Sequence, residues 1–204
     1  MRSKTFIKNI DIIMIPWLSP RDLKMFYSYL DRASVYFEYG SGGSTFQANL
    51  RTNIKKIYSV ESDIEWCNAL NTKMDSKKIV KKYHEMKTLP NTWGNPGPGC
   101  THKEMMNYSN NLSYLDPDEI KRIDLILIDG RFRVACCLKS FACIGESCII
   151  AFDDFLTRPY YHVVLEYFDI IDKTQDNRMV FLRKKNNVLN VPLSLIAKYE
   201  LITN

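Results

Sequence analysis

The chain has 204 residues, of which 46% are hydrophobic and 25% are charged, and its formal net charge at pH 7 is +5. This composition is typical of a globular protein with a buried core, and it excludes an intrinsically disordered chain. The apolar runs are too short for a membrane span, and the modest charge argues against nucleic acid as a partner. Asn9 and Asp11 interrupt the first apolar stretch, which is therefore a poor signal peptide, and we expect a cytoplasmic protein.

The first half of the chain predicts alternating helices and strands. Ser19 followed by Pro20 is typical of a helix start, and apolar residues then recur at helical spacing. Short, fully apolar runs between helical segments indicate strands that are buried on both faces. The elements expected in this half are helices over 20–31, 44–51 and 63–74, and strands over 35–39, 56–60 and 79–84.

Residues 88–114 differ in composition from the rest, because prolines, glycines and asparagines are frequent there. A loop of this length is usually functional or disordered, and we expect it to form a lid. After it, the regular alternation returns. The elements expected in this half are strands over 124–128, 147–152 and 179–183, and helices over 133–143 and 159–171.

Apolar strands that alternate with helices indicate a parallel sheet covered on both sides. The fold class predicted is α/β: a doubly wound, mostly parallel, seven-stranded sheet with helices on both faces, as in a Rossmann-like methyltransferase fold. We expect a single domain over residues 1–204. Its parts would be an N-terminal extension and helix (1–32), a cofactor-binding core (33–185) and a C-terminal tail (186–204).

Six cysteines lack the spacing of a typical metal site. The four in the second half of the chain lie in apolar segments without a C-x-x-C pair, and no His-x-x-x-His accompanies them. Buried, reduced thiols in a reducing compartment are therefore the preferred interpretation.

Ligands of open parallel sheets bind at the carboxyl ends of the strands, and here these ends carry acids and glycines. The sequence VYFEYGSGGST places Glu38 before Gly40 and Gly42, where bare backbone lets a ligand approach closely. Glu61 closes the second strand, where a carboxylate can accept both hydroxyls of a ribose. Glu38 would repel a pyrophosphate but suits a ligand with an ammonium or sulfonium group.

This combination resembles the class I S-adenosylmethionine-dependent methyltransferases, over residues 15–185. The resemblance implies that the cofactor is S-adenosylmethionine, with its methionine part above the glycine turn and its amino group near Glu38. It also implies that Ser44 and Thr45 bind the carboxylate at a helix N-terminus and that Glu61 binds the ribose. The full set of cofactor-binding residues expected is Glu38, Gly40, Ser41, Gly42, Ser44, Thr45, Glu61 and Asp129.

Three aspartates end the two strands after the long loop: Asp129 in LILIDGRF, and Asp153 with Asp154 in IIAFDDF. Crowded carboxylates need a cation, and Mg²⁺ prefers oxygen ligands. The positions resemble those of metal-dependent sugar O-methyltransferases, which implies that all three residues bind Mg²⁺ (or Mn²⁺). The alternative is that these aspartates only cap the turns after their strands.

The resemblance implies a mechanism in which the metal activates an acceptor hydroxyl and the oxygen attacks the sulfonium methyl in line. Asp129, Asp153 or His162 would be the catalytic residue that takes the proton, and Arg131 would pair with the acids or bind the acceptor. The substrate residues expected are Arg131, Arg158, His162, Trp93 and His102.

A sugar or glycan is the leading acceptor hypothesis. DGRFR and DDF-x-x-RPYY resemble methyltransferase modules found with glycosyltransferases in algae and their large viruses, which implies possible fusion to or association with glycosyltransferase domains, in the host cytoplasm if the source is viral. The alternatives are a non-sugar hydroxyl, a catalytically silent cofactor-binding domain and, least favoured, a dehydrogenase. The oligomeric state stays open.

Overall fold

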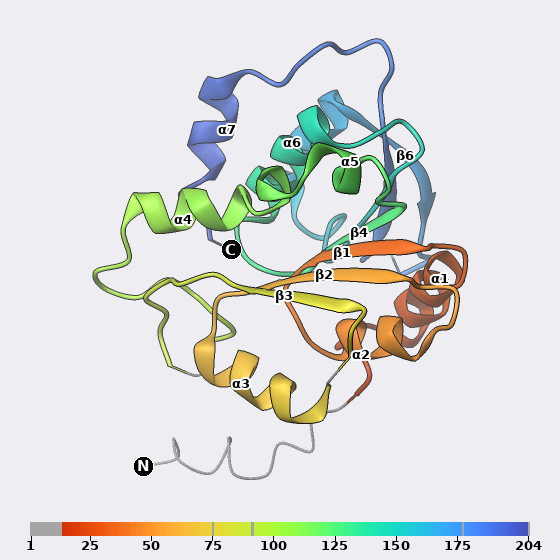
Figure 1. Cartoon of the computed structure of the whole chain (residues 1–204). Coiled ribbons are helices and arrows are strands. Elements are labelled where there is room, and N and C mark those ends of the chain that lie inside the picture. Colours follow the sequence, from red (N-terminus) through yellow and green to blue (C-terminus); the bar gives the residue numbers. More distant parts are fainter. Residues whose placement is uncertain (1–13, 75, 91, 177, 204) are drawn as a thin grey trace.

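The computed structural model describes residues 14–203 except 75, 91 and 177, so most of the expected N-terminal extension lies outside the described residues. The described chain contains a seven-stranded sheet in the order β3-β2-β1-β4-β5-β7-β6, in which β7 is antiparallel to both of its neighbours (Figure 1). The strands are β1 (Val35–Tyr39), β2 (Lys56–Glu61), β3 (Ile79–Tyr83), β4 (Leu125–Ile128), β5 (Ile149–Phe152), β6 (Phe168–Lys173) and β7 (Val180–Lys184).

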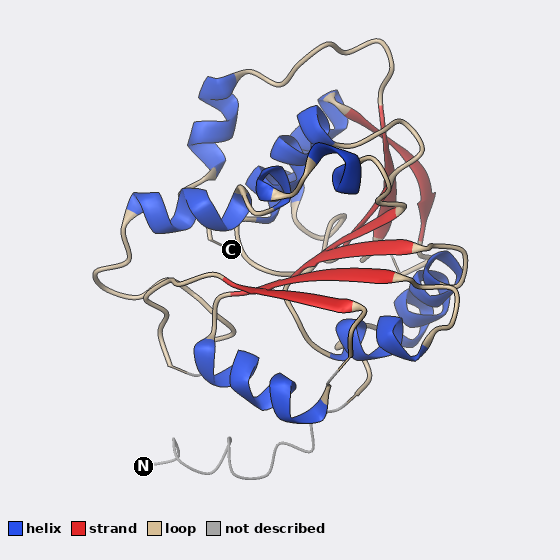
Figure 2. Ribbon diagram, viewed as in Figure 1, coloured by secondary structure: helices blue, strands red, loops and turns tan. Residues whose placement is uncertain are grey.

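Helices cover both faces of this sheet (Figure 2). One group lies on the face that carries Tyr36 and Leu127, and it comprises α1 (Pro20–Leu30), α2 (Gly43–Leu50) and α3 (Ile64–Lys73). The other group comprises α4 (His102–Ser109), α5 (Pro117–Ile120), α6 (Arg133–Cys143) and α7 (Leu193–Tyr199), with the short 3₁₀ helices η1 (Leu112–Tyr114) and η2 (Pro159–Glu166). The predicted doubly wound, mostly parallel fold is confirmed.

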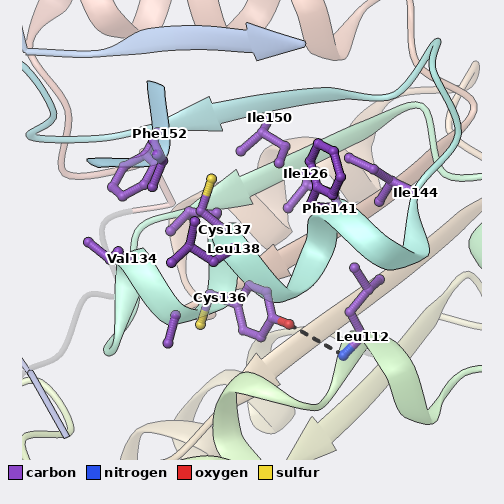
Figure 3. Packing of buried hydrophobic residues seen from close by; sticks show 14 of the residues in the cluster. Leu112, Ile126, Val134, Cys136, Cys137, Leu138, Phe141, Ile144, Ile150 and Phe152 are labelled. Carbon is purple, nitrogen blue, oxygen red and sulfur yellow. Dashed lines mark hydrogen bonds between the residues drawn. The ribbon is translucent and has the colours of Figure 1, made fainter. Parts of the chain in front are cut away.

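The core follows from the alternation of side chains along each strand. On one face, Ile126 and Ile150 pack against Leu138 and Phe141 of α6, which is buried along most of its length (Figure 3). The cysteines of this helix belong to that packing, because Cys136 and Cys137 are fully buried. Four of the six cysteines are buried, and the other two, Cys100 and Cys143, are partly exposed.

The prediction of one long helix over 159–171 is wrong. This stretch is the 3₁₀ helix η2 followed by the edge strand β6, which pairs with β7 through a bulge between Ile170 and Asp172. Most side chains of β6 are exposed, so its sequence FDIIDK lacks the apolar run that identifies the inner strands. The long loop is also shorter than expected, since α4 begins within it.

The expected C-terminal tail folds back onto the body of the protein. Its helix α7 packs against α6, with Tyr199 buried and Ile196 partly buried in the same core cluster. In the described part of the chain, none of the helices is long and apolar enough to cross a membrane.

Candidate cofactor and catalytic site

The turn after β1 is built by backbone packing that requires glycine. Gly40 has a φ of +96°, in the left-handed region, and a Cβ there would lie 2.9 Å from the backbone nitrogen of Gly130. Gly130 follows β4, the neighbour of β1 in the sheet. The turns after these two strands therefore touch, and the ends of β1 and β4 form one continuous surface.

Glu38 supports this turn from inside the protein. Its carboxylate accepts hydrogen bonds from the hydroxyls of Tyr36 (2.8 Å), Ser44 (2.6 Å), Ser59 (2.6 Å) and Thr45, and the residue is fully buried. Burial raises the pKa of Glu38, and the four hydroxyl donors oppose that rise.

Three sequence-based predictions concern these residues, and they stay predictions beside the contacts that the structure shows. Glu38 was expected beside the cofactor's amino group, yet both of its oxygens face hydroxyls of the protein. Ser44 and Thr45 were expected to bind the cofactor carboxylate, yet their hydroxyls donate to Glu38. The hydroxyl of Thr45 also accepts from the backbone N–H of Gly42 at 2.9 Å. A buried carboxylate needs such donors, and they bind α2 to the glycine turn.

Glu61 lies at the carboxyl end of β2, beside the same turn. Its carboxylate accepts the backbone N–H groups of Ser41 (3.2 Å), Ser62 (2.7 Å) and Asp63 (2.8 Å). Burial raises the pKa of Glu61 to about 7, although the three N–H donors oppose the shift. Asp63 caps α3, as its position in the sequence predicts. A narrow hollow, too tight to hold a water molecule, lies here and is lined by Ser41, Thr45, Ser59, Glu61, Cys67, Leu70 and Met74.

Two segments close over these strand ends. The chain at Ile15 crosses the start of α2 so tightly that a Cβ on Gly43 would overlap the Ile15 backbone. The loop after β3 places Gly94 on Ser62, where a Cβ would lie 2.7 Å from the Ser62 hydroxyl oxygen. The rings of Trp17 and Trp93, with centroids 6.4 Å apart, join the two segments. The two segments thus lie against Gly43 and Ser62, beside the carboxyl ends of β1 and β2.

Arg131 stabilises the second of these segments, the loop after β3 that carries Trp93. Its guanidinium donates to the backbone carbonyls of Trp93 (2.8 Å) and Thr92 (3.1 Å), across 38 and 39 residues of sequence. Arg131 thus makes its hydrogen bonds to this loop, and its positive charge also acts on Asp129, where it opposes the rise in pKa that burial causes. Trp93 is 71% exposed, so its ring is available to a ligand at the mouth of the site.

Asp129, Asp153 and Asp154 do meet at the ends of β4 and β5, as predicted, but around another residue. Arg133 lies among them, with its guanidinium 3.0 Å from Asp129, 3.6 Å from Asp153 and 3.4 Å from Asp154. The Arg133 side chain is 9% exposed. The sequence pattern gave no sign of this role, because α6 begins only at Arg133 and the left-handed backbone at Phe132 sets the direction of the side chain.

Asp154 binds two further arginines. Arg158 and Arg178 each place a guanidinium nitrogen 2.8 Å from a different oxygen of Asp154. Arg158 also donates to the hydroxyl of Tyr161 at 2.8 Å. The Arg158 guanidinium thus pairs with Asp154 and Tyr161, and its predicted contact with an acceptor stays a prediction.

The three aspartates do not fit the expected Mg²⁺ (or Mn²⁺) site. Mg²⁺ requires near-octahedral oxygen ligands at about 2.0–2.1 Å. Here a guanidinium stands among the oxygens, and the described residues contain no group of three acidic, histidine or cysteine ligands placed to hold a metal ion. The proposed metal ligation by Asp129, Asp153 and Asp154 is corrected accordingly.

Asp129 and Asp153 differ in their access to solvent. The Asp129 side chain is 28% exposed, whereas that of Asp153 is 4% exposed. Burial, followed by the charge of Asp129, raises the pKa of Asp153 to about 8. Burial also raises the pKa of Asp129, against the opposing charge of Arg133. Among the described residues, Oδ1 of Asp153 has no hydrogen-bond partner. A proton is therefore readily held between these two groups.

The two histidines predicted for the site, among three in the chain, lie elsewhere. His102 is exposed and sits 3.8 Å from Glu200, next to α7, so the structure places it against the C-terminal tail. The ring of His162 in η2 packs on Phe155 with centroids 5.2 Å apart, and its buried Nε2 has no hydrogen-bond partner among the described residues. The structure thus gives neither histidine a bond to the aspartate cluster that would mark it as catalytic.

The strand order is that of the Rossmann-like methyltransferase fold. The chain is similar to a methyltransferase-like protein from Silicibacter pomeroyi, with a TM-score of 0.77 and 23% identity over 93% of this chain and 99% of that one. At this identity the similarity shows the fold alone.

More distant similarities are to a putative RNA methyltransferase from Pyrococcus horikoshii (TM-score 0.49, 13% identity, 82% of this chain and 83% of that one) and to the MycE methyltransferase of mycinamycin biosynthesis, solved with Mg and SAH (TM-score 0.48, 12% identity, 84% and 47%). No protein-family model and no curated protein sequence matches the chain.

Proposed function

We propose that the protein is an S-adenosylmethionine-dependent methyltransferase that methylates a hydroxyl group. The observation that supports this most strongly is the junction of three strand ends. Gly40 after β1 packs on Gly130 after β4, and Ser41 donates its backbone N–H to Glu61 at the end of β2. The glycine-rich turn therefore lies beside Asp129 and beside the Glu61 carboxylate, which suits a ribose. Ligands of such sheets bind at these strand ends.

In this proposal, each group has one task. The backbone of Gly40, Ser41 and Gly42 lies below the methionine part of the donor, and Glu61 accepts the ribose hydroxyls. Glu38 lies beneath the turn and stabilises its conformation by accepting hydrogen bonds from hydroxyl groups. Binding opens the cover formed at Trp17 and Trp93, and the cover then excludes water from the sulfonium group.

Asp129 is the carboxylate that meets the acceptor, because it is the most exposed of the three aspartates. The acceptor oxygen attacks the methyl carbon, the carbon–sulfur bond breaks, and its electron pair stays on sulfur. The hydroxyl proton passes to Asp129, next to Asp153. The products are the methyl ether and S-adenosylhomocysteine, and catalysis consists mainly of alignment and proton removal.

A sugar or glycan is the acceptor class that we propose. The rings of Trp17 and Trp93 are 76% and 71% exposed at the mouth of the site, and such rings stack well on the apolar face of a sugar. Association with glycosyltransferase domains belongs to the same proposal, since a glycan acceptor would be made there.

The direct test is methyl transfer from S-adenosylmethionine to a panel of monosaccharides, oligosaccharides and non-sugar alcohols, followed by mass spectrometry. We expect one or more sugars to gain a methyl group with equimolar S-adenosylhomocysteine. Transfer only to non-sugar alcohols would remove the glycan part of the proposal. Donor binding without transfer to any hydroxyl would favour a silent binding domain.

The raised pKa of Glu61 predicts a pH-dependent affinity for the nucleoside part of the donor. The ionised form accepts the ribose hydroxyls, so affinity should increase as pH rises through about 7. Between about pH 6 and pH 8 the ionised fraction changes roughly tenfold, which sets the expected change in Kd. Calorimetric titration with 5′-methylthioadenosine measures this without the amino acid part of the donor. Glu61→Gln should abolish the slope, and an equally steep slope in that variant would contradict the role of Glu61.

A further inference from the structure

Arg133 is placed so that its side chain turns back from α6 toward the strand ends. The residue before it, Phe132, has a φ of +53°, in the left-handed region, and its side chain is fully buried. This conformation is uncommon for a bulky residue and persists only where the surroundings enforce it. The backbone between β4 and α6 is thus shaped to bring Arg133 into the carboxylate cluster.

All three nitrogens of the Arg133 guanidinium are engaged. Nε donates to the carbonyl of Gly130 (3.0 Å), Nη1 to the carbonyl of Asp153 (2.9 Å), and Nη2 to the carbonyl of Asp129 (3.2 Å). The side-chain contacts with the three carboxylates come in addition to these bonds. One residue therefore ties the end of β4 to the end of β5, through backbone as well as side-chain oxygens.

Charge within the cluster is balanced by the protein itself. Three carboxylates face three guanidinium groups, because Arg158 and Arg178 complete the set at Asp154. Burial by itself would lower the pKa of Arg133, but the neighbouring acids outweigh it and raise that pKa. A divalent ion at this place would have to displace a buried guanidinium that already has its hydrogen-bond partners, and would face two more cations nearby.

We propose that Arg133 is a built-in cation that takes the place of a metal ion between Asp129, Asp153 and Asp154. Its role is to position Asp129 and to neutralise the cluster, and the chain binds no divalent cation there. The consequence for catalysis rests on the function proposed above: methyl transfer by this protein proceeds in the presence of a chelator. Arg133 acts through Asp129 and so is a positioning residue.

Metal binding tests the proposal without any assay of activity. The probe is Mn²⁺, measured by electron paramagnetic resonance and by the shift in melting temperature of the wild-type protein, Arg133→Ala and Arg133→Lys. We expect no bound Mn²⁺ and no shift for the wild type or for Arg133→Lys, which keeps a cation. Arg133→Ala leaves Asp129 and Asp153 without a paired cation, while Arg158 and Arg178 still pair with Asp154. This variant should therefore melt earlier, bind one Mn²⁺ and regain several degrees on Mn²⁺ addition.

One Mn²⁺ bound by the wild type, and lost in Asp153→Asn, would overturn the proposal. An Arg133→Ala protein that folds but binds no Mn²⁺ would equally overturn the claim that Arg133 replaces an ion. If Arg133→Ala does not fold, the wild-type titration decides by itself. Failure to detect methyl transfer would count against the proposed function only, because the Mn²⁺ measurements do not depend on it.

Discussion

Asp129→Asn is expected to reduce the rate of methyl transfer by about 10²- to 10⁴-fold, while the affinity for S-adenosylmethionine changes little. Asparagine keeps the size of the side chain but removes the carboxylate that takes the proton from the acceptor. The loss should appear in kcat at saturating donor and acceptor, since the proton is removed only as the oxygen attacks.

Asp118→Asn is the matched control, because the Asp118 side chain is 78% exposed and only pairs with Lys121 on the surface. It should leave the rate unchanged. Melting temperatures of both variants separate a catalytic loss from a folding defect, which matters because Asp129 also binds Arg133. A rate within a factor of two or so of the wild type in Asp129→Asn would remove this residue from the mechanism.

Glu38→Ala is expected to lower the free energy of unfolding by more than about 3 kcal/mol and to abolish donor binding. Removing the buried carboxylate leaves the hydroxyls of Tyr36, Ser44 and Thr45 without their acceptor, while Ser59 keeps its bond with the Ser41 hydroxyl. Each buried unsatisfied group costs about 1–3 kcal/mol. The glycine turn loses its connection to α2 at the same time. Urea unfolding followed by far-UV circular dichroism measures the first effect, and calorimetry with S-adenosylmethionine measures the second.

Glu38→Gln is the informative partner of that variant, because it keeps an acceptor oxygen and the side-chain volume. We expect it to be intermediate in stability and to retain donor binding. The opposite result, full stability of Glu38→Ala with loss of donor binding, would mean that Glu38 contacts the cofactor's amino group after all.

The inner part of the fold could be predicted from the sequence because it depends on strong local patterns. Strands such as Leu125–Ile128 are uninterrupted apolar runs, and the helix Arg133–Cys143 begins and ends where its pattern predicts. The edge strand β6 could not be predicted in this way. Its side chains are mostly exposed, and pairing with β7 rather than local composition makes it a strand.

Only part of the candidate site, likewise, could be predicted from the sequence. The convergence of Asp129, Asp153 and Asp154 follows from the order of the strands, so the sequence predicts it. Which residue neutralises these acids depends on the direction of its side chain, and the segment DGRFR contains two arginines. Arg133 contacts the acids, whereas Arg131 donates to the loop at Trp93. The left-handed backbone at Phe132 lies between the two arginines, and a buried, bulky residue holds this conformation only through tertiary packing.

The internal role of Glu38 could have been predicted from the residues that share its face of the strand. Glu38 shares its face of β1 with Tyr36, and it pairs in register with Ser59 of β2. Both neighbours supply hydroxyls, and so does the start of α2 at Ser44 and Thr45. A carboxylate surrounded by hydroxyl-bearing positions indicates an internal network in preference to a ligand contact.

Isothermal titration calorimetry of S-adenosylmethionine with the wild-type protein and with Gly40→Val tests most directly whether the strand-end junction is a donor site. We predict saturable binding of one donor per wild-type chain and none to Gly40→Val, whose side chain would collide with the Gly130 backbone and fill the turn. Absence of binding to folded wild-type protein, or equal binding by both proteins, would contradict the assignment of this junction as the cofactor site.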